Sequence, residues 1–123
     1  MRAAARRVAS VVKHTPLRRS AALSRVAGGD VYLKLETEQI TGSFKLRGAY
    51  NALASLDDDA RRRGIVASSA GNHGLGVAYA ARALGIRATI FVPATAPRVK
   101  REGIAALGAT VDASEPDYDA AMV

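Results

Sequence analysis

The 123-residue sequence contains no cysteine, which excludes a disulfide framework, thiolate catalysis and zinc sites built on cysteine. It has only two histidines, so we do not expect a histidine-based metal site. No apolar run approaches the roughly 18–20 residues that a membrane-spanning helix needs. The apolar content of 49% is nevertheless enough for one domain with a hydrophobic core, although the chain is too short for two complete domains.

Acidic residues are missing from positions 1–29, which hold seven arginines and lysines and therefore account for the whole net charge of +7. An arginine-rich, acid-free N-terminus is typical of a transit peptide or of an arm that binds polyanions. It is also typical of a solvated first helix, because Val8, Val11 and Val12 form an apolar stripe at helical spacing. The segment has no aromatic side chain on which bases could stack, and we expect no nucleic acid as a partner.

The second half of the sequence alternates helical and strand-like stretches, and a glycine marks each change. Gly64, Gly85 and Gly108 each precede a short β-branched stretch, as expected of glycines that end helices. This order predicts an α/β fold with a twisted parallel sheet, right-handed crossovers, helices on both faces and a ligand at the carboxyl ends of the strands. The expected strands are 65–69, 86–92 and 109–111, and the expected helices are 73–84 and 97–107.

The first half of the sequence has weaker signals. Pro16 biases Thr15 toward an extended conformation, so we interpret the segment around it as a connector. We expect a strand at 31–35, a polar loop at 36–42, a helix at 44–56 with Ser43 as its cap, and a helical turn where three aspartates precede three arginines at 57–63. Residues 115–123 resemble the start of another helix with no ending signal, from which we expect an N-terminal fragment of a longer protein.

The stretch SSAGNHGLG, residues 68–76, lies between a predicted strand and a predicted helix. A glycine turn there directs backbone N–H groups toward a ligand, and the helix dipole favours a negative charge. Ser69, Asn72 and His73 add side-chain donors, so the turn is interpreted as a cradle for a carboxylate or phosphate. Its glycines do not follow the pattern of nicotinamide or P-loop sites. The alternative is a tight turn in which Asn72 and His73 only cap the helix.

Lys45 lies between Phe44 and Leu46 at the start of a predicted helix, where the dipole disfavours a cation. The flanking apolar residues are expected to remove its amine from water, and both effects favour the uncharged amine that a Schiff-base nucleophile needs. Gly48, in the middle of the same helix, suggests the close approach of another group. The alternative is a surface lysine whose amine reaches solvent.

These stretches together resemble the pyridoxal-phosphate-dependent threonine/serine dehydratase family, which includes serine racemases and has the tryptophan-synthase-β-like fold (fold type II). The resemblance is carried, in order, by TPLRRSAALS (15–24), LKLETEQITGSFKLRGA (33–49) and ASSAGNHGLG (67–76). Gly74 and Leu75 depart from the alanine and glutamine usual after the histidine. The resemblance implies that the family's phosphate cup and the residue facing the pyridine nitrogen come from beyond residue 123.

The resemblance also implies roles for individual residues. Lys45 would bond covalently to pyridoxal 5'-phosphate, Phe44 would pack beside its ring and Asn72 would hydrogen-bond its phenolic oxygen. The substrate carboxylate would be held by Ser69, Ala70, Gly71, Asn72 and His73. The implied reaction is β-elimination of L-threonine or L-serine to a 2-keto acid and ammonia, and the fragment alone is expected to be inactive.

The same resemblance leaves related activities open, namely threonine synthase, diaminopropionate ammonia-lyase and cysteine synthase. From a different class, a basic binding module that uses residues 1–29 is a further alternative. We expect residues 1–40 to belong with a larger domain and residues 41–123 to form part of a smaller α/β domain. At full length we expect a cytoplasmic homo-oligomer that acts on a small amino acid and contacts no membrane.

Overall fold

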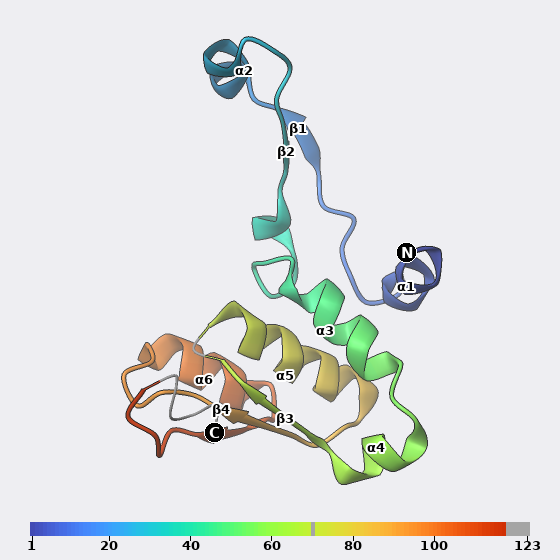
Figure 1. Cartoon of the computed structure of the whole chain (residues 1–123), viewed down its shortest axis with the longest axis vertical. Coiled ribbons are helices and arrows are strands. Elements are labelled where there is room, and N and C mark those ends of the chain that lie inside the picture. The colour runs from blue at the N-terminus through green and yellow to red at the C-terminus, as the bar shows by residue number, and fades with distance from the viewer. Residues whose placement is uncertain (70, 118–123) are drawn as a thin grey trace.

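The computed structural model describes residues 1–69 and 71–117, which form short helices and five strands (Figure 1). The first half contains α1 (Arg2–Val8), β1 (Leu17–Arg19), α2 (Ala21–Ala27), β2 (Tyr32–Lys34), the 3₁₀ turn η1 (Glu36–Glu38) and α3 (Lys45–Ala54). The second half contains α4 (Asp58–Arg63), β3 (Ile65–Ser68), α5 (Asn72–Leu84), β4 (Ala88–Phe91), α6 (Arg98–Ala106) and β5 (Thr110–Asp112).

The main sheet has the strand order β3-β4-β5, and all its strands are parallel. Since strand order follows chain order, two crossovers of the same hand place α5 and α6 on the same face of the sheet. Val66, which points to the opposite face, is 70% exposed. The predicted α/β fold and parallel sheet are therefore confirmed, whereas the helices that pack on this sheet in the described part of the chain lie on one face.

The hydrophobic core lies between this face of the sheet and α5, with α3 and α6 packed against α5. Leu46 of α3, Ile90 of β4 and Ile104 of α6 are fully buried. Alanines and glycines line much of α5, so neighbouring helices approach it closely. α5 is consequently the central element of the domain, and its N-terminus lies at the carboxyl end of β3 (Figure 1).

The three glycines that the sequence predicts as helix ends lie where expected. Gly64, Gly85 and Gly108 all have a positive φ, between 67° and 87°. At Gly64 a Cβ atom would also stand 2.9 Å from the carbonyl oxygen of Arg87, so a side chain there is excluded twice. The adjacent helix α4 is capped by Asp57, whose carboxylate accepts a hydrogen bond from the Ala60 N–H at 2.7 Å, and the predicted helical turn is confirmed.

The segment interpreted as a connector is structured, and that prediction is wrong. β1 pairs antiparallel with β2, and α2 lies between the two strands in the chain. Ser20 caps α2 by accepting from the Leu23 N–H, and Gly28 ends it in the left-handed conformation. The extended backbone that Pro16 favours enters a strand.

The β1–β2 hairpin with α2 projects away from the rest of the protein, whereas α1 lies against α3 (Figure 1). Val8 of α1 is buried, and the Arg7 guanidinium donates to the Asn51 amide at 2.5 Å. Because α1 ends at Val8, Val11 and Val12 of the expected apolar stripe follow the helix in a turn, where they are partly buried against the core. The division of the chain at residue 40 into parts of two domains stays a prediction.

Two further expectations need correction. α3 begins at Lys45 and ends at Ala54, and Ser43 does not cap it, because the Ser43 hydroxyl is buried without a hydrogen-bond partner among the described residues. The backbone at Phe44 is already helical, so the turn closes without a side-chain acceptor. Residues 115–117 form bends rather than a helix, and the remainder of the helix expected at 115–123 lies outside the described residues.

Candidate active site

Lys45 is the first residue of α3, and its side chain is exposed. Its Nζ atom lies 5.2 Å from the centre of the Phe44 ring, and Phe44 itself is 58% exposed. The expectation that flanking apolar residues remove this amine from water is wrong for the described chain. Phe44 lies beside the ammonium as a cation–π partner on the surface rather than covering it.

The backbone of Lys45 lies directly against α5. A Cβ atom at Gly76 would stand 3.1 Å from the Lys45 carbonyl carbon and equally close to the Leu46 nitrogen. Figure 1 shows α3 and α5 side by side, with their N-terminal ends on the same side of the molecule. The missing side chain at Gly76 therefore sets how near the lysine lies to the start of α5.

Gly48 does not have the role that the sequence suggested. It is exposed, and nothing lies within 4 Å of the position that its Cβ would take. The close approach occurs instead at two glycines of α5. A Cβ atom at Gly74 would meet the side chains of Ile104 and Ile90 at 2.9 and 3.3 Å, so this glycine accommodates the core.

The turn that leads into α5 is held by the hydroxyl of Ser69, which is 6% exposed. This oxygen accepts hydrogen bonds from the N–H groups of Gly71 at 3.2 Å and Gly74 at 2.9 Å. The bond to Gly74 satisfies one of the first N–H groups of α5, which have no intrahelical acceptor. Ser69 thus shapes the predicted anion cradle, and the N-terminus of the 13-residue α5 opens beyond it.

The other residues predicted for the cradle lie at the same place. Asn72 and His73 are the first two residues of α5, and both are exposed. Ala70 lies outside the described residues. Within the described chain no hydrogen bond joins the Lys45 side chain to this turn, so the structure places the predicted groups at neighbouring helix starts without a direct bond between them.

Lys100 is a further cation at this end of the sheet. It lies in the first turn of α6, and its Nζ donates to the Asn72 Oδ1 at 2.8 Å. Lys100 is not among the site residues predicted from the sequence, because it lies 28 positions from Asn72. A usable signal was present, since a lysine in a first helical turn without acidic residues contradicts the usual charge preference of helix starts.

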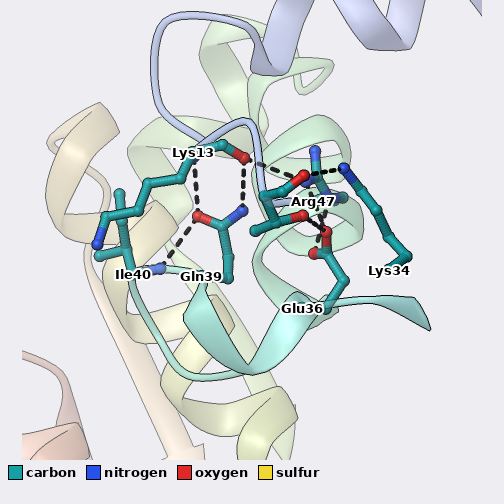
Figure 2. A network of polar contacts seen from close by, with 7 residues as sticks. Lys13, Lys34, Glu36, Gln39, Ile40 and Arg47 are labelled. Carbon is teal, nitrogen blue, oxygen red and sulfur yellow. Dashed lines mark hydrogen bonds and ion pairs between the residues drawn. The ribbon is translucent and has the colours of Figure 1, made fainter. Parts of the chain in front are cut away.

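A network of polar contacts fastens the other side of α3 to the N-terminal segment (Figure 2). Arg47, two residues after Lys45, donates to both carboxylate oxygens of Glu36 at 2.8 and 2.9 Å. The buried Thr15 hydroxyl donates to the same carboxylate at 2.5 Å. Chiefly through the hydrogen bond from Arg47, the pKa of Glu36 falls to about 2.

Gln39 completes the network with an uncharged amide that is 3% exposed. It accepts from the Lys13 N–H at 2.9 Å and donates to the Lys13 carbonyl at 3.0 Å (Figure 2). Arg47 also donates to that carbonyl at 3.2 Å. The first turn of α3, which carries Lys45, is therefore fixed from one side by this network and from the other by Gly76.

Residues 8–123 match the protein family described as "Pyridoxal-phosphate dependent enzyme". The chain belongs to this family. The match covers Lys45, the turn into α5 and Lys100, and it confirms the family and the cofactor that the sequence motifs predicted.

Individual members of the family give the same picture. The chain is 53% identical over 108 residues to an L-threonine ammonia-lyase of Thermotoga maritima. The aligned residues cover 88% of this chain and 27% of that protein. The chain superposes on maize serine racemase with a TM-score of 0.91 at 36% identity, covering 98% of this chain and 37% of that one. It superposes on the processed form of threonine deaminase isoform 2 from Solanum lycopersicum with a TM-score of 0.85 at 38% identity, covering 93% of this chain and 31% of that one. The chain thus spans about a quarter of the length of the curated relatives it matches.

The residues present fit pyridoxal phosphate on two sides of that molecule. Its aldehyde requires an accessible amine, which Lys45 supplies, and the buried Ser43 hydroxyl two residues earlier still lacks a partner among the described residues. Its anionic oxygens require positive potential, which the N-terminus of α5 and the Lys100 ammonium supply. The individual roles of Lys45, Phe44, Asn72 and the 69–73 turn stay predictions.

Proposed function

We propose that this chain forms the lysine-bearing part of a pyridoxal-phosphate-dependent ammonia-lyase that converts L-threonine or L-serine to a 2-keto acid and ammonia. The observation that carries the proposal is the position of Lys45. Its amine is exposed at the start of α3, and its backbone packs against α5, the helix that begins at the predicted anion cradle. The 53% identity to an L-threonine ammonia-lyase favours this reaction within the family.

In this proposal the residues of the chain hold the reactants and move one proton. Lys45 Nζ would hold the cofactor covalently and would also be the base that removes the proton from the substrate α-carbon. Asn72 donates to the phenolic oxygen, Phe44 contacts the ring, and the 69–73 turn binds the substrate carboxylate. The bound cofactor supplies an electron sink for the charge that the departing proton leaves on the α-carbon.

The overall reaction balances without an oxidant. The substrate loses its α-hydrogen and its β-hydroxyl group as one water molecule. Hydrolysis of the resulting enamine, through its imine form, takes up one water molecule and releases ammonia. Threonine and serine both carry the required β-hydroxyl group. The exposed position of Lys45 suits a base that must reach a substrate bound at the neighbouring turn.

A basic binding module is less well supported by the contacts of the N-terminal segment. Val8 of α1 is buried and Arg7 is bonded to Asn51, so the first helix takes part in packing against α3. Such packing supports an ordinary surface helix rather than a free polyanion-binding arm. Retention of the full-length protein on heparin that disappeared on deletion of residues 1–29 would favour the binding module.

The proposal also covers the setting of the enzyme. No helix in the described part of the chain is long and apolar enough to cross a membrane. We propose a cytoplasmic homo-oligomer at full length, with a small amino acid as its substrate. Sedimentation of the purified full-length protein tests the oligomeric state, and a monomer would contradict it.

The proposed function is tested by locating the lysine that holds the cofactor. The full-length protein is loaded with pyridoxal 5'-phosphate, reduced with borohydride and digested, and the labelled peptide is identified by mass spectrometry. We expect the label on Lys45, its loss in Lys45→Ala and its retention in the control Lys13→Ala, which changes an exposed lysine side chain. Label on another lysine would overturn the site.

The substrate is tested by measuring keto-acid release from threonine, serine and diaminopropionate. We expect release from threonine or serine with the higher kcat/KM. Preference for diaminopropionate, or cysteine formation from O-acetylserine and sulfide, would instead identify one of the related activities.

A further inference from the structure

The ammonium group of Lys100 lies where the local structure disfavours it. The residue belongs to the first turn of α6, which contains no acidic side chain to offset the positive end of the helix. Its partner is the neutral amide of Asn72, 2.8 Å away, whereas Arg98 of the same turn is paired with the carboxylate of Glu102. A residue that breaks a local preference at the carboxyl ends of the strands is a candidate for a role in the site.

The hydrogen bond between the Lys100 ammonium and Asn72 fixes the orientation of the Asn72 carboxamide. A lysine ammonium has hydrogen-bond donors only, so the Asn72 atom that faces Lys100 must be the carbonyl oxygen. The Nδ2 group of Asn72 is then directed along the other branch of the planar amide and is available as a donor. With the opposite orientation, two donors would face each other at Lys100.

We propose that Lys100 is a positioning residue, which orients the Asn72 carboxamide so that Nδ2 donates to an anionic oxygen of the bound pyridoxal phosphate. This inference rests on the proposed function, because it assumes that Asn72 contacts the cofactor. Lys100 acts through Asn72, and its positive charge also polarises the amide toward stronger donation.

The exposure of the bond separates this role from a structural one. The contact between Lys100 and Asn72 is exposed, and exposed polar contacts contribute little to folding. Loss of the Lys100 ammonium should therefore leave the thermal midpoint of the cofactor-free protein nearly unchanged. Its effect should appear when an anionic oxygen has to be bound at Asn72.

The test compares four variants of the full-length protein: Lys100→Met, Lys100→Arg, Asn72→Ala and the double variant Lys100→Met/Asn72→Ala. The control is Arg98→Met, which removes an exposed cation from the same helical turn. The dissociation constant for pyridoxal 5'-phosphate is measured by absorbance titration, together with the pH dependence of the absorbance of the bound cofactor and the thermal midpoint without cofactor.

We expect Lys100→Met to weaken cofactor binding about fivefold to tenfold, the effect of losing one hydrogen bond, and to shift the pH profile of the absorbance. Lys100→Arg should restore most of the affinity, and Arg98→Met should change it less than twofold. In the Asn72→Ala background Lys100→Met should have almost no further effect, because the group through which it acts is gone.

An equal loss from Lys100→Met in both backgrounds, or no loss in either, would overturn the inference. If the wild-type protein binds the cofactor at Lys45 while Lys100→Met behaves like the wild type, the proposed function stands and only the positioning role fails. If the wild-type protein does not bind the cofactor, both are overturned.

Discussion

The backbone of Lys45 lies so close to Gly76 that a single methyl group at Gly76 would stand 3.1 Å from the Lys45 carbonyl carbon. The contact joins Lys45, which is predicted to hold the cofactor, to α5, whose N-terminal turn is predicted to bind the substrate carboxylate. Because the opposing atoms belong to the backbone, no side-chain rotation can relieve the crowding.

Gly76→Ala is therefore expected to destabilise the full-length protein despite the better helix propensity of alanine. Overpacking costs about 1–3 kcal/mol, and we expect a cost in the upper part of this range because rigid backbone atoms oppose the new methyl group. Such a cost is larger than the gain of roughly 1 kcal/mol from replacing a helical glycine. Denaturant unfolding measures the change. The control is Gly48→Ala on α3, where the Cβ meets no atom within 4 Å and stability should rise. Equal stabilisation by both changes would contradict the crowding argument.

Lys45→Ala should abolish covalent retention of pyridoxal phosphate without unfolding the protein, because the side chain is exposed. Loss of an acid–base group lowers kcat by about 10²–10⁴-fold, and loss of the covalent attachment adds to this. Keto-acid release and the absorbance of the dialysed protein measure both effects. A variant that kept its absorbance after dialysis would show that Lys45 is not the attachment point.

Ser69→Ala should destabilise the turn into α5 by about 1–3 kcal/mol, because the buried Gly74 N–H loses its acceptor. Ser68→Ala is the matched control on the preceding residue. The Ser68 hydroxyl is buried without a partner among the described residues, so its removal should be neutral or stabilising. Urea unfolding of both variants distinguishes them, and an equal loss of stability would mean that the Ser69 hydroxyl does not hold the turn.

The ion pair between Glu36 and Arg47 predicts a dependence of stability on pH. The pKa of Glu36 is lowered to about 2 from an ordinary value of 4.5, so the contribution is fully present above pH 4.5 and is lost as the pH falls toward 2. Glu36→Gln should lower the free energy of unfolding by about 2 kcal/mol at neutral pH. The difference in unfolding free energy between this variant and the wild type should become smaller below pH 4.5. Urea midpoints between pH 3 and pH 7 measure this.

The control for this prediction is Glu38→Gln, which changes an exposed carboxylate of the same 3₁₀ turn. Its effect should be small and nearly constant over the same range. A gap between wild type and Glu36→Gln that widened on acidification would have the wrong sign for a lowered pKa.

The elements of the second half could be predicted from the sequence because each boundary depends on a local constraint. Gly64, Gly85 and Gly108 adopt a positive φ that few other residues tolerate, and the strands that follow them are β-branched. In the first half, α2 has clear end signals in Ser20 and Gly28, but it lies shortly after Pro16, a residue that is typical of irregular segments. Ser43 had the sequence of a cap, but its hydroxyl is buried where no described backbone N–H reaches it.

The residue types of the site could be predicted, whereas their arrangement could not. Lys45 and the 69–73 turn stand out by local chemistry and by resemblance, and a single residue attracts notice when it breaks a local rule. The bond between Lys100 and Asn72 and the crowding at Gly76 join segments about 30 residues apart. Such relationships follow from the packing of α3 and α6 against α5 on one face of the sheet, which periodicity does not encode.

The amide of Gln39 attaches the N-terminal segment to the body of the protein with one donated and one accepted hydrogen bond, and it does so without a charge. An attachment of this kind is indifferent to ionic strength, unlike the neighbouring carboxylate–guanidinium pair. The segment before α3 should consequently stay in place at salt concentrations that would loosen a purely ionic tether.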